Sequence, residues 1–425
     1  MLKKISLSFF LIAASLSALF AQSISTYSPY SRYGIGEMKT KGFTQQRAMG
    51  GLAQPIRNPF GINYLNPASY SVQDTMSFIL DFGFEAGGTL YETSTQSKRT
   101  GIANLDHVAI QFPVTKRGGI SLGFVPFSQV GYEIKQRETN PYLITNVGII
   151  DYIYSGNGGI NKLYAGFAYE PLKFLSVGAN LSYMFGSLDY EKSMEFPADA
   201  PYANTYRKTS VTVSDVSINL GLQATFFVNK EKKQKMIIGA TLDNETNLGA
   251  KRIDRVFIQY QSYQDTVNFD ESSKSSLKLP RNVSAGVSFM SDNKLLAGFE
   301  YSYQDWSKAI FVNNVDSLQK SQSFRFGLEY TPNRYDLKSY LKRVSYRVGF
   351  HTTSGYVKLR DNQINNYGIT FGVGLPFRNT NTSFNLSVEL GQRGTTANSL
   401  VKESYSLVNF SVVFYDFWFF KRKYN

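Results

Sequence analysis

Residues 216–226 read VSINLGLQATF, and the fold is predicted from the pattern in this stretch. Apolar side chains at the even-numbered positions alternate with small or polar ones, a period of two that is typical of a β-strand. Comparable runs occupy residues 177–186, 367–375 and 384–391. One face of each run is apolar, and the other carries mostly Gly, Ser, Asn and Thr.

Such runs recur from residue 76 to the end of the chain. Their centres lie near residues 83, 108, 123, 165, 181, 220, 240, 286, 299, 327, 348, 371, 388 and 411. This gives about fourteen strands, an even number as in single-chain bacterial outer-membrane barrels.

The connections between the runs alternate in kind. Compact, turn-forming links alternate with longer polar segments near 136–158, 190–208, 262–276 and 305–320. In outer-membrane barrels the short turns are periplasmic and the long loops extracellular. The segment 331–343 is the exception, because it is long and falls on the periplasmic side.

A soluble β-sandwich would also give alternating strands, but its outer face would be dominated by charged residues. Here the polar face carries few charges, and aromatic residues make up 15% of the chain, with 29 Tyr and 33 Phe. Aromatic girdles are typical of outer-membrane barrels. We therefore predict an all-β protein, a 14-stranded antiparallel transmembrane β-barrel over residues 76–425 in the bacterial outer membrane.

A basic side chain on the lipid face at mid-depth would cost about 2–4 kcal/mol. Charged residues within the strands are therefore expected to point into the lumen. These residues are Glu300, Arg325, Glu329, Arg347 and Glu389.

The first 21 residues predict a secretory signal peptide. Lys3 and Lys4 precede an apolar run, and Ala21 supplies a small residue at the expected cleavage site. No later apolar run is long enough for a transmembrane helix. The formal net charge of +13 is spread over turns and ends, so no nucleic-acid partner is expected.

Residues 22–75 are irregular and rich in Gly, Pro and Asn. A fourteen-stranded barrel encloses a lumen too wide for wall side chains alone to fill. Irregular backbone at membrane depth is tolerated where it is buried in protein. The segment is therefore predicted to be a plug, or hatch, inside the barrel. A disordered arm is disfavoured by its apolar residues, which are Met49, Leu52, Ile56, Phe60, Ile62 and Leu65.

The hatch contains RAMGG at 47–51 and, ahead of the first strand, NPA at 66–68. This combination resembles the FadL/TodX family of outer-membrane transport proteins. The segments at 155–186 and 365–378 and the C-terminal end resemble the branch of that family found in Bacteroidota. The hatch motif that the resemblance marks comprises Arg47, Gly50, Gly51, Asn66, Pro67 and Ala68.

The resemblance implies passive uptake of hydrophobic small molecules, such as long-chain fatty acids, through a gap at a kink in the third strand. In this chain the third strand carries Pro126 at its middle. Proline cannot donate to a β-ladder and usually marks an edge or a bulge. We expect the lateral gate at Pro126 and Phe127, although a simple bulge near a barrel rim is the plainer interpretation.

The inward charges allow two interpretations. Arg325 or Arg347 could receive a substrate carboxylate, because a guanidinium matches a carboxylate bidentately. Alternatively, the arginines pair with the inward glutamates and with the hatch, and this pairing is the favoured interpretation.

An enzyme is not expected. The two histidines, His107 and His351, both alternate with apolar residues and so point inward, and neither has a nucleophile motif nearby. Metal-ligand spacing is absent from the sequence, so no metal and no cofactor are expected.

The expected partners are outer-membrane lipid, lipopolysaccharide and a hydrophobic small-molecule ligand. The alternative function is a non-transporting scaffold for a secretion or envelope-assembly complex, because barrels resembling this one serve type IX secretion as shuttles. In that case the 136–158 loop, with Tyr142, Tyr152 and Tyr154, would grip another outer-membrane or secretion protein.

Overall fold

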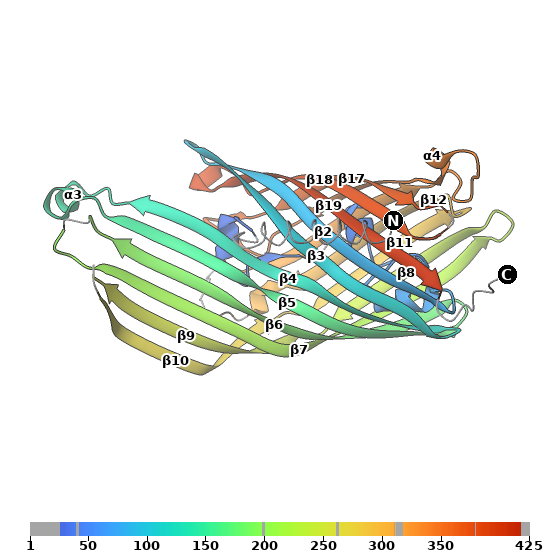
Figure 1. The fold of residues 1–425 in the computed structure, drawn as a ribbon, viewed down its shortest axis with the longest axis horizontal. Coiled ribbons are helices and arrows are strands. Elements are labelled where there is room, and N and C mark those ends of the chain that lie inside the picture. Colours follow the sequence, from blue (N-terminus) through green and yellow to red (C-terminus); the bar gives the residue numbers. More distant parts are fainter. Residues whose placement is uncertain are drawn as a thin grey trace, which may run out of the picture.

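The computed structural model describes residues 26–39, 42–197, 200–260, 263–309, 311, 318–378 and 380–417. The signal peptide predicted at 1–21 lies outside these residues. Within them the wall is one antiparallel sheet that closes on itself, because the last strand pairs with the first wall strand along its whole length (Figure 1).

The wall strands follow one another in chain order around the barrel. They are β2 (Ser77–Glu92), β3 (Ser97–Thr115), β4 (Gly118–Arg137), β5 (Asp151–Leu172), β6 (Leu175–Glu195), β7 (Asn204–Asn229), β8 (Gln234–Asp243), β9 (Thr246–Gln259), β10 (Gln264–Leu279), β11 (Asn282–Ser291), β12 (Leu295–Asp305), β13 (Lys320–Tyr330), β14 (Ser345–Thr353), β17 (Asn366–Pro376), β18 (Ser383–Arg393) and β19 (Lys402–Phe417). The pair β8 and β9 occupies one position in the wall, since both pair with β7, and β10 with β11 occupies the next. The predicted fourteen-stranded antiparallel barrel is confirmed for the described chain.

Shorter elements lie in the hatch and in the loops. They are η1 (Pro29–Arg32), β1 (Glu37–Met38), α2 (Thr44–Arg47), η2 (Pro67–Val72), α3 (Pro141–Val147), η3 (Trp306–Lys308), α4 (Tyr340–Arg343), β15 (Lys358–Leu359), β16 (Asn362–Gln363) and η4 (Ala397–Ser399). None of the described helices is long and apolar enough to cross a bilayer.

The stretch VSINLGLQATF forms the middle of β7 and shows why the wall closes as it does. Its apolar side chains point outward, and Leu220 is 49% exposed, whereas Gln223 on the opposite face is fully buried. The same alternation in β6 and β8 keeps the three strands in register, with Leu220 opposite Ala179 and Leu242. A slip of one residue would turn every apolar side chain inward.

In the outer part of β7 the apolar side chains point into the barrel instead of outward. There Val211 and Val213 are buried inside, and Lys208 and Thr212 are exposed outside. The buried pair joins an apolar cluster, the outer core, that fills this end of the barrel. Its buried members are Ile35, Phe127, Val130, Tyr132, Ile160, Met184, Leu188, Tyr190, Val211, Val213, Leu248, Ala250, Leu277, Leu279, Trp306 and Phe311.

The reversal corrects part of the loop prediction. The segments 190–208 and 262–276 were expected to be loops, but most of each is strand, in β6, β7 and β10. These strand ends extend beyond the part of the wall whose outer face is apolar. Their outward side chains are polar, and their inward side chains pack on the outer core.

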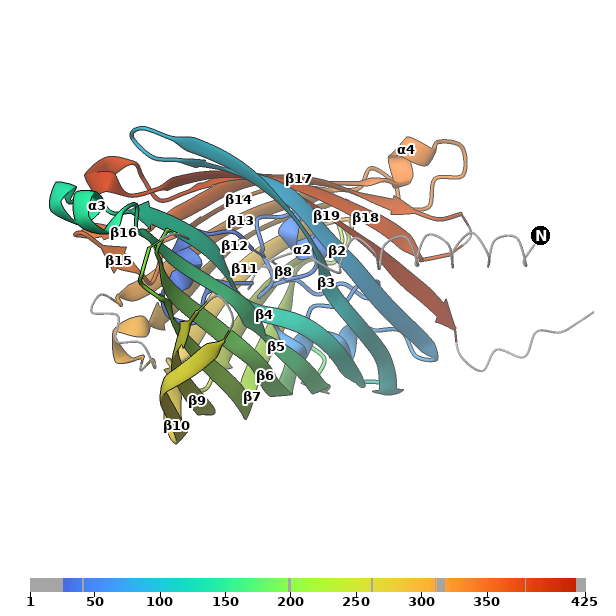
Figure 2. The same cartoon turned by 60° about the vertical axis from the view of Figure 1, so that its left-hand side comes forward.

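The hatch lies inside the barrel, as the blue segments of Figures 1 and 2 show. Residues 43–56 are all buried. Phe43, Ile62 and Tyr70 pack against wall residues that include Tyr164 and Val413. The segments α3 and α4 lie at opposite ends of the barrel, and α4 belongs to the 331–343 segment that was expected among the short turns (Figure 1).

Candidate functional site

The ladder between β3 and β4 stops part-way along the wall. Among the described residues, pairing runs from Thr115 and Gly118 to Val108 and Phe124 and then ends. Beyond this point β3 still pairs with β2, and β4 still pairs with β5. Figure 2 shows the β2–β3 hairpin turning away from β4. We call this opening, which begins at Pro126, the β3–β4 break.

A bulge lies on each side of the break. In β4, Pro126 pairs with Asn161 and Ser128 with Ile160, so Phe127 is the extra residue. In β3, the extra residue is Asp106. A bulge bends its strand and re-aims the side chain; here Phe127 is turned into the outer core and Asp106 toward the hatch.

The hatch spans the break from inside through Glu37–Lys39, which we call the seal. Glu37 and Met38 form β1 and pair with Gln129 and Ser128 of β4. The Lys39 backbone N–H donates to the Phe127 carbonyl at 2.9 Å. The Lys39 ammonium then reaches Glu85 of β2 at 2.7 Å. The seal therefore joins the two sides of the break.

Ion pairing also fixes the other end of the seal. Arg393 of β18 donates to the Glu37 carboxylate at 2.6 Å, and the Thr26 hydroxyl donates at 2.8 Å. Burial alone would raise the pKa of Glu37, but Arg393 and Lys39 outweigh burial and lower it well below its usual value. A lowered carboxyl pKa stabilises the folded state above the unfolded pKa, and this contribution is lost only as the pH falls through the lowered value in strong acid.

Arg47 anchors the hatch at the foot of the break. Its guanidinium pairs with Glu85 of β2 and Asp106 of β3, and donates to Asn409 of β19 at 3.1 Å. All of these side chains are buried. One hatch residue therefore holds three wall strands next to the break.

The rest of the hatch motif shapes the backbone. Gly50 and Gly51 have φ of 69° and 82°, which favours glycine, and the Gly50 N–H donates to the Thr370 hydroxyl at 2.8 Å. Asn66 caps the turn formed by Pro67 and Ala68 and donates from Nδ2 to the Gln54 carbonyl at 2.8 Å.

Glycines on the inner face of the wall make room for the hatch. A Cβ added at any of them would come within 3.0 Å of a hatch atom. This glycine belt comprises Gly119, Gly166, Gly178, Gly221, Gly239, Gly286, Gly298, Gly327, Gly349 and Gly372. Close approach of the hatch therefore accounts for many of the glycines that the sequence places on the inner face.

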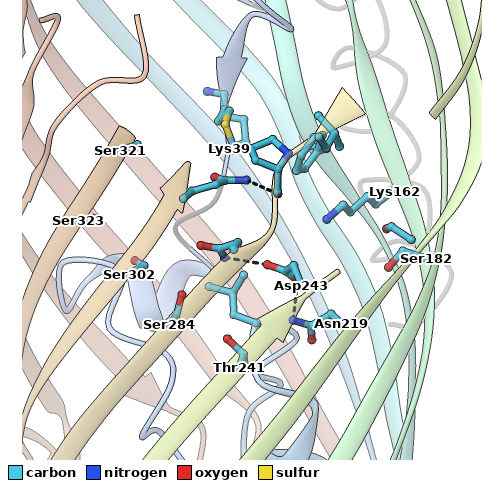
Figure 3. Close-up of a pocket in the computed structure, with 18 of the residues that line it drawn as sticks. Lys39, Lys162, Ser182, Asn219, Thr241, Asp243, Ser284, Ser302, Ser321 and Ser323 are labelled. Atoms are coloured by element: carbon cyan, nitrogen blue, oxygen red, sulfur yellow. Dashed lines mark hydrogen bonds between the residues drawn. The ribbon is translucent and has the colours of Figure 1, made fainter. Parts of the chain in front are cut away.

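A cavity of about 240 Å³ lies between the hatch, the outer core and the wall (Figure 3). Val125, Pro126 and Phe127 at the break and Met38 and Lys39 of the seal form one side. The labelled side chains of the remaining wall are mostly hydroxyls, amides and charged groups. They are Lys162, Ser182, Asn219, Thr241, Asp243, Ser284, Ser302, Ser321 and Ser323. The cavity is lined by both apolar and polar side chains, and it borders an opening in the wall.

A family model described as BamG matches residues 1–425. The chain belongs to the BamG family. No curated protein matches the BamG-family chain significantly.

The BamG-family chain is also similar to solved structures of channels. One is the toluene transporter TbuX of Ralstonia pickettii, with 16% identity over 88% of this chain and 98% of that one and a TM-score of 0.58. Another is the toluene transporter TodX of P. putida, with 13% identity over 90% and 100% and a TM-score of 0.58. A FadL homologue of Pseudomonas aeruginosa has 13% identity over 91% and 100% and a TM-score of 0.54.

These identities show a shared fold. The resemblance to FadL/TodX proteins is thus confirmed for the fold, although the matching family model has a different name. The Bacteroidota branch stays a prediction.

In this BamG-family chain both candidate arginines lie in ion pairs. Arg325 pairs with Glu300, which also accepts the backbone N–H groups of Ala53 and Gln54 in the hatch at 2.8 Å each. Arg347 pairs with Glu329 at 2.6 Å.

The fifth inward charge and both histidines are also engaged. Glu389 contacts His351 Nε2 at 2.9 Å. The ring nitrogens of His107 lie 2.8 Å from Asp106 and 3.0 Å from Asp81, and the ring stacks on Phe43 at 3.7 Å. Carboxylates therefore occupy both nitrogens of His107.

Several residues of the site were not predicted from the sequence. Lys39, Glu85 and Asp106 come together at the break only because the hatch folds against the wall, where Lys39 reaches Glu85 and Arg47 pairs with both carboxylates. Lys162 could have been noticed, because it is the one basic residue within the alternating run centred near residue 165, at an inward position.

Proposed function

We propose that this BamG-family chain is an outer-membrane protein that admits hydrophobic small molecules by passive lateral diffusion through the β3–β4 break. The observation that carries the proposal is the break itself, which adjoins a cavity and is spanned from inside by the short seal. The substrate's own gradient and the burial of its apolar surface would drive the movement.

The outer surface supports the membrane placement. In β7, outward apolar side chains run from Val216 to Phe226, and their alternation fits the 9–11 residues that a tilted strand needs to cross a bilayer. Lipid and lipopolysaccharide would therefore surround the wall. The neighbouring structures named above are described as toluene transporters and a FadL homologue, which agrees with a hydrophobic ligand.

The proposal gives the predicted site residues separate roles. The described part of residues 22–75 forms the plug, and the hatch motif holds it in the barrel. Pro126 and Phe127 form the lateral gate. Glu300 retains the plug by accepting from Ala53 and Gln54, and Arg325, Glu329, Arg347 and Glu389 form ion pairs and hydrogen bonds in the wall, in preference to binding a substrate carboxylate. No catalytic residue, metal or cofactor enters the proposal.

A disulfide across the seal tests the lateral route. Met38 and Ser128 are directly opposite each other in an antiparallel pair, where Cα atoms lie about 4.5–5.5 Å apart, within disulfide range. The chain has no Cys of its own. We expect Met38→Cys with Ser128→Cys, when oxidised, to reduce uptake of radiolabelled toluene or laurate to that of cells lacking the protein, and a reductant to restore it.

The control pair is Thr89→Cys with Thr100→Cys, which joins two strands that are already paired and lie away from the seal. Uptake in this control should not respond to oxidation. Equal uptake by the locked and control proteins would remove the lateral route from the proposal.

A second candidate is the non-transporting scaffold. Four exposed tyrosines favour it, because aromatic residues are enriched at protein interfaces: Tyr142 in α3, Tyr202 next to β7, and Tyr260 and Tyr263 between β9 and β10. All lie in connections of the outer strand ends. Purification in mild detergent separates the two candidates, since a stoichiometric partner protein that is lost on Tyr142→Ser and Tyr263→Ser substitution supports the scaffold.

A further inference from the structure

The connection between β13 and β14 is long, although it lies at the end of the barrel where the neighbouring wall strands are joined by short turns. Its residues 335–343 read YDLKSYLKR and include α4; we call them the rim segment. Leu337 is followed by Lys338, and Leu341 by Lys342. Neither the hatch nor the lateral route gives this segment a role.

The rim segment exposes its large apolar side chains. Leu337 is 101% exposed and Leu341 68%. The turn that presents Leu337 is held by Asp336, whose Oδ1 accepts the backbone N–H groups of Lys338 at 2.9 Å and Ser339 at 2.7 Å. A hydrogen-bonded turn that displays leucines in this way indicates a surface with an apolar partner.

The rim segment lies on the lipid side of the wall. Tyr346 of β14 points outward, since the next residue, Arg347, is buried inside and Val348 is exposed again. The Tyr346 hydroxyl donates to the Leu341 carbonyl of α4 at 3.1 Å. The residue opposite Tyr346 in β13 is Tyr330, which is also exposed. Figures 1 and 2 both show α4 projecting beyond the strands at this end. The segment therefore borders the apolar outer face at its periplasmic edge, where tyrosines mark a membrane interface.

The start of the same connection contacts the hatch instead. The Arg334 guanidinium lies 3.8 Å from the centre of the Phe60 ring. The Thr331 and Ser345 hydroxyls, at the two ends of the connection, lie 2.7 Å apart. The connection thus crosses the edge of the wall from the hatch to the outside, and Arg334 is not one of the charges that α4 carries outward.

The rim segment itself has three basic residues and one acidic residue. They are Lys338, Lys342, Arg343 and Asp336. Lys342 lies 3.7 Å from Asp336, so an excess of two positive charges remains. Lysine and arginine at a membrane edge bury their stems along apolar surface and keep the charge among the headgroups.

This combination fits a lipid surface better than a soluble protein. Interfacial segments bind membranes through buried apolar area together with attraction to anionic lipids, and the rim segment offers both. A soluble protein would have to approach α4 at the border of the bilayer, on the outward side of Tyr346. The exposed leucines are also continuous with the apolar outer face of β13 and β14.

We propose that the rim segment anchors this end of the barrel in the periplasmic leaflet of the outer membrane. Leu337 and Leu341 lie among the acyl chains, and Lys338, Lys342 and Arg343 contact anionic phospholipid headgroups. The contact is made outside the barrel and involves neither the cavity nor the β3–β4 break. This inference rests on the membrane placement in the proposed function and does not depend on uptake.

A fluorescent label at residue 337 tests insertion. Because the chain has no Cys, Leu337→Cys carries a single environment-sensitive NBD group on the full-length protein, reconstituted in nanodiscs of phosphatidylcholine and phosphatidylglycerol. We expect quenching by a nitroxide on the lipid acyl chain and protection from aqueous iodide. Lys232→Cys, in the exposed β7–β8 turn, should show the reverse. Leu220→Cys, on the outward face of β7, should be quenched from the lipid and reports on the membrane placement itself.

Spin-labelled lipids then test the choice of headgroup. At equal mole fraction, nitroxide-labelled phosphatidylglycerol should quench the label at residue 337 with an apparent association constant about 5- to 25-fold above that of nitroxide-labelled phosphatidylcholine. Each basic residue near an anionic surface contributes about fivefold, and the segment has an excess of two.

Two charge variants of the labelled protein complete the test. The first neutralises the rim segment and should quench equally with both lipids; it carries Lys338→Gln, Lys342→Gln and Arg343→Gln. The second removes the same charge from the exposed β7–β8 turn and should keep the preference; it carries Lys230→Gln, Lys232→Gln and Lys233→Gln. Heat-dependent gel migration verifies that each variant is folded.

A label at residue 337 that is open to iodide, while the label at 220 is quenched from the lipid, would overturn the anchor and leave the proposed function standing. Labels open to iodide at both positions would contradict the membrane placement itself. Equal quenching of the parent by the two lipids, or a preference that survives neutralisation of the rim segment, would also overturn the inference. Protection from iodide that appears only in native outer-membrane vesicles would assign the segment to a protein partner instead.

Discussion

Replacing Arg47 with methionine is expected to unseat the hatch. The change leaves the buried carboxylates of Glu85 and Asp106 without the guanidinium between them. Lys39 still reaches Glu85, and His107 still contacts Asp106, but removing one partner of a buried ion pair typically costs about 3–5 kcal/mol. The unseated population should therefore rise by about 150-fold or more, measured as conductance in planar bilayers and as trypsin cleavage after Arg57.

Neutralising the stranded carboxylates provides the sharpest control. Adding Glu85→Gln and Asp106→Asn to Arg47→Met should recover much of the closed state, because removing both sides of a buried pair costs far less than removing one. Arg137→Met removes an exposed arginine whose pair with Asp151 is worth at most about 1 kcal/mol, and it should remain closed. If Arg47→Met conducts no more than Arg137→Met, the hatch is not held at this point.

Adding a single methyl group at Gly349, in the wall, is also expected to unseat the hatch. A Cβ at this position would lie 2.2 Å from the Gly50 backbone nitrogen and the Met49 carbonyl carbon. Neither backbone atom can rotate away, so the hatch must shift. Overpacking of this kind costs about 1–3 kcal/mol, which raises the unseated population about 5- to 150-fold. Bilayer conductance and protease access of Gly349→Ala measure the change.

Gly249→Ala is the matched substitution. Gly249 also lies in a wall strand, but its added Cβ would meet nothing nearer than 3.7 Å. Both variants change strand propensity equally, so only contact with the hatch distinguishes them. Equal conductance of the two variants would show that the glycine belt does not determine how the hatch is seated.

The strand array could be predicted because alternation is a local signal. Each of the fourteen expected centres falls within a wall strand, from residue 83 in β2 to residue 411 in β19. In the membrane band the sequence pattern and the surroundings agree: apolar side chains such as Leu220 face lipid, and Gln223 faces the hatch.

The outer ends of the strands could not be predicted in the same way. The period of two continues there, but the apolar side chains now face the lumen, so that Val213 is buried inside and Thr212 faces out. Which face of a strand contacts water depends on where the bilayer ends and on what fills the lumen. The sequence of a single strand specifies neither.

The residues of the candidate site likewise divide into those that could be predicted from the sequence and those that depend on the tertiary structure. The family resemblance, together with Pro126 in the third strand, pointed to the place where the β3–β4 ladder ends, and the bulge expected as the plainer interpretation is present there as well. The pairing of Arg325 with Glu300 was one of two open interpretations, and only the register of β12 and β13 places the two side chains together.

The alternating strands, the fourteen strand positions of the wall and the irregular segment ahead of them could be predicted from the sequence, because periodicity and the conformational limits of Gly and Pro act over a few residues. The strands β9 and β10 were not among those predicted. Only the folded barrel brings Arg47 to Asp106 and carries Lys39 across the break to Glu85. These relationships depend on barrel closure, which brings strands far apart in the chain within bonding distance of the hatch.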